Sequence, residues 1–143
     1  MNTSISGSRR LISTAALTFM IAASASASPL QDVISGYSAE AKMNAVTFVG
    51  FSADRGRALF LSRSTTGKPE TSSCTSCHSS DPKGNGETRA GKEIAPMALS
   101  KTPERYGDPK KVEKWFRRNC KSVLGRVCTS LEKGDFLTFM ASQ

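Results

Sequence analysis

The sequence predicts a single all-α domain preceded by a short export signal. Three observations support this prediction. Apolar residues recur at helical spacing in several stretches, recognisable helix caps precede most of these stretches, and no segment alternates between apolar and polar residues for long. A chain of 143 residues is also enough for one domain once a targeting segment is set aside.

Two helices are expected before residue 64. The first covers Pro29 to about Lys42, because apolar residues recur there at i, i+3, i+4 and i+7 (Leu30, Val33, Ile34 and Tyr37). Ser52 then caps a second helix from Ala53 to about Ser62, and Asp54 places a negative charge in its first turn, where it suits the helix dipole.

Two further helices follow a polar loop over residues 64–73. The third begins with Asp108 at the N-cap and Pro109 at the first helical position. The last begins at Thr129, since Glu132 three residues later completes a capping box, and it continues to the C-terminus. The expected domain is therefore all-α, loop-rich and single.

Residues 1–27 have the pattern of a cleaved secretory signal. Arg9 and Arg10 precede a mostly apolar stretch over residues 11–22, and Ala25-Ser26-Ala27 fits the cleavage site. The stretch is shorter than the about 20 residues that cross a bilayer, although an uncleaved anchor stays open as an alternative. The expected mature domain is 28–143, located in the periplasm with no membrane span.

The motif that indicates function is Cys74-Thr75-Ser76-Cys77-His78. This C-x-x-C-H pattern is typical of covalent haem attachment, because two thiols on one helical turn can reach both vinyl groups of a porphyrin. The adjacent His78, the only histidine of the chain, is then the proximal iron ligand. The alternatives are a thioredoxin-like redox pair, half of a zinc site, or a plain disulfide; no second C-x-x-C exists for zinc.

Cys120 and Cys128 are the remaining cysteines. In an oxidising compartment an even leftover pair most simply forms a disulfide, with two free thiols as the alternative.

The sixth iron ligand decides the function. Methionine is the usual partner of histidine in electron-carrying cytochromes, and Met97 is the methionine to consider, since Met43 and Met140 are expected in the core. However, Met97 follows Pro96, whose carbonyl is expected to accept the ring N–H of His78. Met97 would then pack on the proximal side of the haem.

The third helix offers another candidate. Asn119 stands at i+7 of an apolar row formed by Val112, Trp115 and Phe116, and a polar amide on a buried face needs a partner. Either Asn119 caps the end of its helix, or its side-chain oxygen is directed at the haem iron. The residues alone leave both interpretations open.

The motifs together resemble a known family. Gly56-x-x-x-Phe60, C-x-x-C-H, Pro96 and an aromatic-rich terminal helix form the general class I cytochrome c pattern. The segments 91–96 (GKEIAP) and 112–120 (VEKWFRRNC), with the second cysteine at 128, are similar to the sphaeroides haem protein family. Its members are high-spin, gas-binding relatives of class I cytochromes c, related to the cytochromes c″.

The resemblance implies a class I-like fold around one covalent haem c, with an extra N-terminal helix and with Pro96, Trp115 and Phe116 around the haem. It implies that Asn119 binds ferric iron and dissociates on reduction, so that ferrous haem takes up O2 or NO. A dihaem cytochrome c is the electron partner that it implies.

Three functions are compatible with these features. The first is a redox protein with a gas site opened by reduction, and the second is a simple six-coordinate electron carrier with Met97 as sixth ligand. The third is an enzyme acting weakly on NO, hydroxylamine or peroxide.

The net charge is +8, and residues 101–126 hold nine Lys or Arg against three acidic residues. That segment is either a solvated helix face or a docking surface for an acidic redox partner. Nucleic acid is not an expected partner of an exported haem protein.

Overall fold

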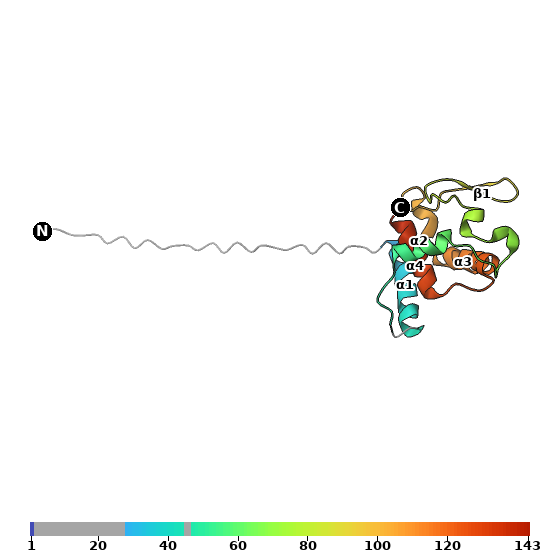
Figure 1. Cartoon of the computed structure of the whole chain (residues 1–143). Coiled ribbons are helices and arrows are strands. Elements are labelled where there is room, and N and C mark those ends of the chain that lie inside the picture. Colours follow the sequence, from blue (N-terminus) through green and yellow to red (C-terminus); the bar gives the residue numbers. More distant parts are fainter. Residues whose placement is uncertain (2–27, 45–46) are drawn as a thin grey trace.

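The computed structural model of the chain describes residue 1 and residues 28–44 and 47–143 (Figure 1). Residues 2–27, which make up almost all of the expected export signal, lie outside the described residues. No described helix combines the length and apolarity needed to cross a bilayer.

Helix α1, Pro29–Asn44, begins where the sequence predicts and continues two residues further. Its buried face consists of residues at helical spacing: Leu30, Val33, Tyr37 and Ala41. Met43 lies off this face and its exposed fraction is 80%, so the expectation that Met43 belongs to the core is wrong. Met140, by contrast, is fully buried as expected.

Helices α2, Ala53–Leu61, and α4, Ser130–Ala141, pack closely against each other. Ser52 accepts a hydrogen bond from the Arg55 amide at the start of α2, and Thr129 and Glu132 form the predicted capping box of α4. The close packing requires a glycine, since a Cβ at Gly56 would overlap the Asp135 carbonyl oxygen. The fully buried side chains at the centre of the core come from this pair of helices: Phe60, Leu137 and Met140.

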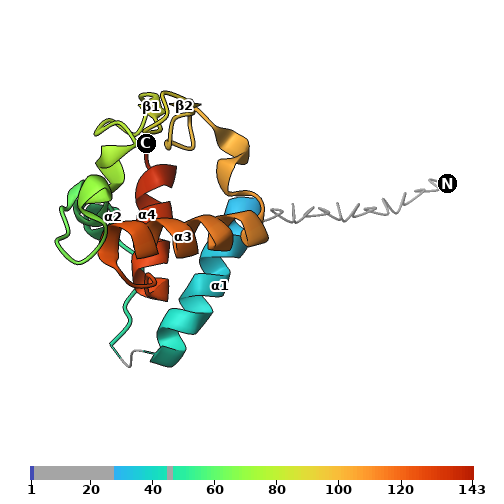
Figure 2. The same ribbon diagram turned by 90° about the vertical axis from the view of Figure 1, so that its right-hand side faces the viewer.

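Helix α3, Pro109–Leu124, runs across the α2–α4 pair (Figure 2). Asp108 caps its N-terminus by accepting hydrogen bonds from the amides of Lys110 and Lys111, at 2.9 and 3.1 Å. Gly125 ends it in the left-handed conformation, with φ of 68°. Because Gly125 rather than Asn119 is the C-cap, the helix continues well beyond Asn119.

Short elements connect the helices. The described residues contain three 3-10 turns, η1 (Pro69–Thr71), η2 (Cys74–Ser76) and η3 (Pro103–Tyr106). Strands β1 (Gly86–Glu87) and β2 (Glu93–Ile94) form an antiparallel hairpin in which Gly86 pairs with Ile94. The sequence did not predict this hairpin, because strands of two residues leave no alternating pattern. The architecture is otherwise the all-α one that was expected.

Candidate haem-attachment site

The C-x-x-C-H motif folds into a single tight turn. Within η2 the amides of Cys77 and His78 both donate to the carbonyl of Cys74, at 3.3 and 3.1 Å. Ser73 caps the turn, since its hydroxyl accepts the amide of Thr75 at 3.2 Å. Local hydrogen bonding therefore places two thiols, at Cys74 and Cys77, and the adjacent imidazole of His78 on one turn.

Both thiols of the motif are free in this structure. Cys74 packs against the hydrophobic core, and burial raises the pKa of its thiol to about 11. The interpretation as a plain disulfide is therefore wrong here. Zinc also lacks ligands, since no group of three or more His, Cys, Asp or Glu in the described residues could hold a metal ion.

The imidazole of His78 is suited to bind iron. Burial, together with the nearby charge of Arg105, lowers the pKa of His78 to about 4, so the ring is neutral at physiological pH. Its Nδ1 atom is buried and has no hydrogen-bond partner among the described residues. The expected bond to the carbonyl of Pro96 is not formed, and that carbonyl instead accepts the hydroxyl of Thr102 at 3.0 Å.

The segment around Pro96 is held by the residues of η3 and its cap. Besides the Thr102 bond, Arg105 donates to the carbonyl of Ala95 at 3.2 Å, and the hydroxyl of Tyr106 donates to the carbonyl of Met97 at 2.7 Å. Met97 belongs to the core cluster, with an exposed fraction of 8%. Its side chain thus packs among apolar residues of the polypeptide, and its place relative to the haem stays a prediction.

The expected haem-contacting residues of α3 differ in burial. Phe116 is half-buried and packs edge-on against the rings of Tyr37 and Phe136. Trp115 is 52% exposed, and the guanidinium of Arg118 lies 5.1 Å from its ring centroid. The row that was expected to be uniformly buried therefore divides: Val112 and Phe116 face the protein, and Trp115 lies beside them.

Asn119 is exposed, five residues before the end of α3. The interpretation of Asn119 as a helix C-cap is wrong, because Gly125 fills that position. Seven residues make almost two helical turns, so Asn119 projects from nearly the same side of α3 as buried Val112. The amide therefore borders the buried face without a capping role.

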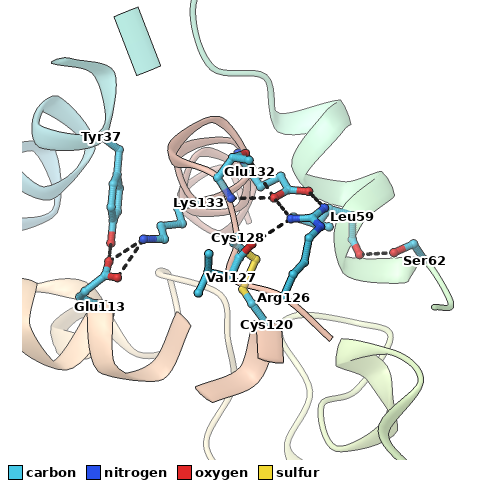
Figure 3. The surroundings of a disulfide bond; sticks show 11 residues. Tyr37, Leu59, Ser62, Glu113, Cys120, Arg126, Val127, Cys128, Glu132 and Lys133 are labelled. Carbon is cyan, nitrogen blue, oxygen red and sulfur yellow. Dashed lines mark hydrogen bonds and ion pairs between the residues drawn. A yellow bond between two sulfur atoms is a disulfide. The ribbon is translucent and has the colours of Figure 1, made fainter. Parts of the chain in front are cut away.

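A disulfide joins Cys120 and Cys128, with their Cα atoms 5.6 Å apart (Figure 3). The pairing predicted from the sequence is therefore confirmed, and the alternative of two free thiols is wrong. The bridge ties the C-terminal part of α3, immediately after Asn119, to the segment that enters α4.

Sequence reasoning missed a polar network between the helices. The ammonium of Lys133 donates to both carboxylate oxygens of Glu113, at 2.9 and 2.8 Å, and the hydroxyl of Tyr37 donates to Oε2 at 2.8 Å (Figure 3). Partial burial raises the pKa of Glu113, but these hydrogen bonds outweigh it and hold the pKa below its ordinary value. No local pattern predicts this network, because its three residues come from three different helices, α1, α3 and α4.

The donor set on the η2 turn fits covalent haem. Two free thiols share the turn with a neutral imidazole, and the buried Nδ1 of that imidazole still lacks a partner. A thioether-forming pair with an adjacent histidine is the attachment chemistry of haem c. Fold and site together define a c-type cytochrome.

Comparison with known proteins gives the family. Residues 46–140 match the family model described as Domain of unknown function (DUF1924). The chain is 54% identical over 116 residues to Cytochrome c-type protein SHP of Cereibacter sphaeroides, spanning 81% of this chain and 84% of the relative. It is also 32% identical over 89 residues to Cytochrome c'' of Methylophilus methylotrophus, 62% of each chain.

Solved structures agree. The structure described as oxidized SHP, an oxygen binding cytochrome c, matches with a TM-score of 0.73 at 53% identity, over 81% of this chain and 97% of that one. Oxidized cytochrome c'' of Methylophilus methylotrophus matches with a TM-score of 0.68 at 26% identity, over 80% of this chain and 94% of that one. The chain belongs to the SHP family, the sphaeroides haem proteins, and its cofactor is haem c.

Proposed function

We propose that this protein binds a diatomic gas at one covalent haem, at an iron position that opens when the haem is reduced. In this proposal Cys74 and Cys77 form the two thioethers, and His78 is the proximal ligand. The side-chain oxygen of Asn119 is the distal ligand of the ferric state, with Pro96, Trp115 and Phe116 around the haem. When bound, haem supplies an iron that changes between ferric and ferrous and coordinates small ligands.

The chemistry of the asparagine side chain explains the switch. A neutral amide oxygen is a weak, hard donor, which suits ferric iron better than the softer ferrous ion. Once released, the same side chain has two N–H donors that can hydrogen-bond a small ligand. Asn119 thus acts as a ligand in one oxidation state and as a hydrogen-bond donor in the other.

The observation that carries the proposal is the place of Asn119. The side-chain amide of Asn119 makes no hydrogen bond with another described residue. Asn119 is not a helix cap, and it directly precedes the Cys120–Cys128 bridge. An asparagine inside a helix has a lower helix propensity than alanine, so helix formation gives no reason for it. A ligand role in a family whose solved member is called an oxygen binding cytochrome c does give a reason.

Asn119→Ala tests the proposal. The ferric absorption spectrum should change to that of a five-coordinate or water-bound haem, and the ferrous spectrum should stay almost unchanged, because the amide has already dissociated there. NO should bind the ferric variant faster than the ferric wild type. Position 119 is an exposed helical position, so the free energy of unfolding of the ferrous protein, in which the amide is not bound to iron, should not fall. Alanine has the higher helix propensity there, by about 0.5 kcal/mol.

Met97→Leu is the matched control, and it addresses the simple electron carrier with Met97 as sixth ligand. This change nearly conserves volume, so it should cost less than about 1.5 kcal/mol and leave the ferric spectrum as it was. A ferric spectrum that changes in Met97→Leu and not in Asn119→Ala would refute gas binding at a reduction-opened site and establish the electron carrier.

We also propose that residues 1–27 direct export to the periplasm, and that 28–143 work there with a redox protein of acidic surface, such as a dihaem cytochrome c. The lysines and arginines of α3 fall into two groups. The larger one (Lys110, Lys114, Arg117 and Lys121) repeats at helical spacing opposite the buried face, as a solvated surface does. Lys111 and Arg118 lie on the side of α3 that carries Trp115. In this proposal their positive charges attract the acidic partner toward that side.

A further inference from the structure

A short loop connects the haem-attachment turn to the end of α3. We call residues 64–71 the strap; they leave α2, pass the C-terminal turn of α3 and lead through η1 to Cys74 (Figure 2, green). The amide of Lys68 donates to the carbonyl of Ser122 at 2.7 Å, and the hydroxyl of Thr66 donates to the carbonyl of Leu124 at 2.8 Å. The hydroxyls of Thr71 and Ser122 also share a hydrogen bond, at 2.8 Å.

These bonds complete the helix from outside. The last four carbonyls of an α-helix have no partner within the helix, and those of Ser122 and Leu124 are among them. The strap supplies three donors to these two carbonyls: the Lys68 amide and the Thr71 hydroxyl to that of Ser122, and the Thr66 hydroxyl to that of Leu124. The C-terminus of α3 is therefore bonded to the strap, which leads to the thiols. The bonded residues are 51 or more positions apart in sequence.

The backbones of the strap and α3 approach each other as closely as glycine permits. A Cβ at Gly67 would overlap the carbonyl oxygen of Val123, and one at Gly125 would overlap the carbonyl oxygen of Thr66. Neither backbone can shift toward the other, and the hydrogen bonds oppose separation. The spacing between the strap and the helix end is thus fixed in both directions.

We propose that Thr71 and Ser122 are positioning residues, which hold Asn119 at the haem and so set how readily its amide dissociates. The inference rests on the proposed role of Asn119. Asn119 lies one turn before Ser122, between the strap contacts and the rest of α3, and the next residue is bridged to α4. With the backbone held on these sides, the amide leaves by rotation of its own side chain, without a shift of α3.

The test uses the full haem-loaded protein with Thr71→Val, Ser122→Ala and the double variant. At saturating cyanide, the rate of ferric binding is limited by departure of the internal ligand. Loss of the shared hydrogen bond should raise this limiting rate about fivefold in each single variant. The double variant should show no more than Thr71→Val alone, because that change already removes both contacts of the Thr71 hydroxyl, to the hydroxyl and to the carbonyl of Ser122. Ser64→Ala, which removes a hydroxyl contact to Thr66 inside the strap, is the matched control and should keep the wild-type rate.

A purely structural role gives a different pattern. If Thr71→Val and Ser122→Ala lower the melting temperature but keep the wild-type limiting rate, the positioning role is refuted. The proposed function fails separately, when Asn119→Ala leaves the ferric spectrum unchanged. A changed spectrum in Asn119→Ala with unchanged rates in the strap variants would overturn the positioning inference alone.

Discussion

Helices α2 and α4 are held together by close packing, whereas α3 is held by a few separate links. In the first pair Gly56 admits the backbone of α4, and the ring of Phe60 packs against those of Phe136 and Phe139. Buried Asp135 reinforces the crossing by accepting the Ser52 amide and the Arg55 guanidinium, both at 2.7 Å.

Helix α3 makes a different kind of contact. Its buried side chains are few (Val112, Cys120 and Val123), and three links fix it: the disulfide, the Glu113–Lys133–Tyr37 network, and the strap. The helix with the proposed distal ligand contributes Val112 and Phe116 to the edge of the core, and its other contacts are these separate links. It can be adjusted one link at a time without dismantling the pair that supports the fold.

The largest effect is expected where the packing is closest. Gly56→Ala places a methyl group against the backbone of Asp135, which cannot move aside, and should lower the free energy of unfolding by about 3 kcal/mol. Gly36→Ala is the matched control: Gly36 lies in α1 with no atom near its missing Cβ, so alanine should stabilise the protein by about 1 kcal/mol. Chemical denaturation measures both. Equal effects of the two changes would contradict the close packing of α2 on α4.

Removing the disulfide should have the next largest effect. Cys120→Ser with Cys128→Ser opens a loop of sequence separation 8, which should cost about 2.5 kcal/mol. Hydrogen exchange then separates the two regions of the molecule. Amides of α3 should lose protection while those of α2 and α4 keep theirs. Uniform loss of protection across all helices would show that α3 is as integral to the core as the other two.

Features of the molecule that depend on neighbouring residues could be predicted from the sequence, whereas contacts between distant residues could not. Helix starts were predictable because their signals are local: Ser52, Asp108 and the Thr129–Glu132 box each act within three residues. The haem motif and the disulfide were predictable for the same reason, since the identity and spacing of cysteines carry the information. Features held by distant pairs were not predictable, and the strap contacts and the Glu113 network are of this kind.

Two errors show where local patterns mislead. Met43 was placed in the core because it precedes the haem motif, but α1 buries only one face and Met43 is not on it. The carbonyl of Pro96 was expected to accept a bond from His78, but the nearby hydroxyl of Thr102 bonds it instead. The apolar periodicity of α3 also could not show where the helix ends, so it could not exclude Asn119 as the C-cap.

The smallest expected effect concerns the Glu113 network and depends on pH. The pKa of Glu113 is lowered in the folded protein, so its carboxylate contributes stability above the unfolded-state pKa, near 4.5, and this contribution is lost as pH falls through the folded pKa. Because the side chain of Glu113 is 52% exposed, Glu113→Gln should cost less than about 1 kcal/mol at pH 7.

The difference in unfolding free energy between wild type and Glu113→Gln should therefore be constant from pH 7 to about pH 5 and shrink as the pH falls through the lowered folded pKa of Glu113. Glu104→Gln is the control, because Glu104 is exposed and forms no ion pair within the described part of the chain. Its difference from wild type should stay near zero throughout. A Glu113→Gln variant more stable than wild type at pH 7 would mean that the partial burial of this carboxylate outweighs its bonds to Lys133 and Tyr37, and that the network does not hold α3.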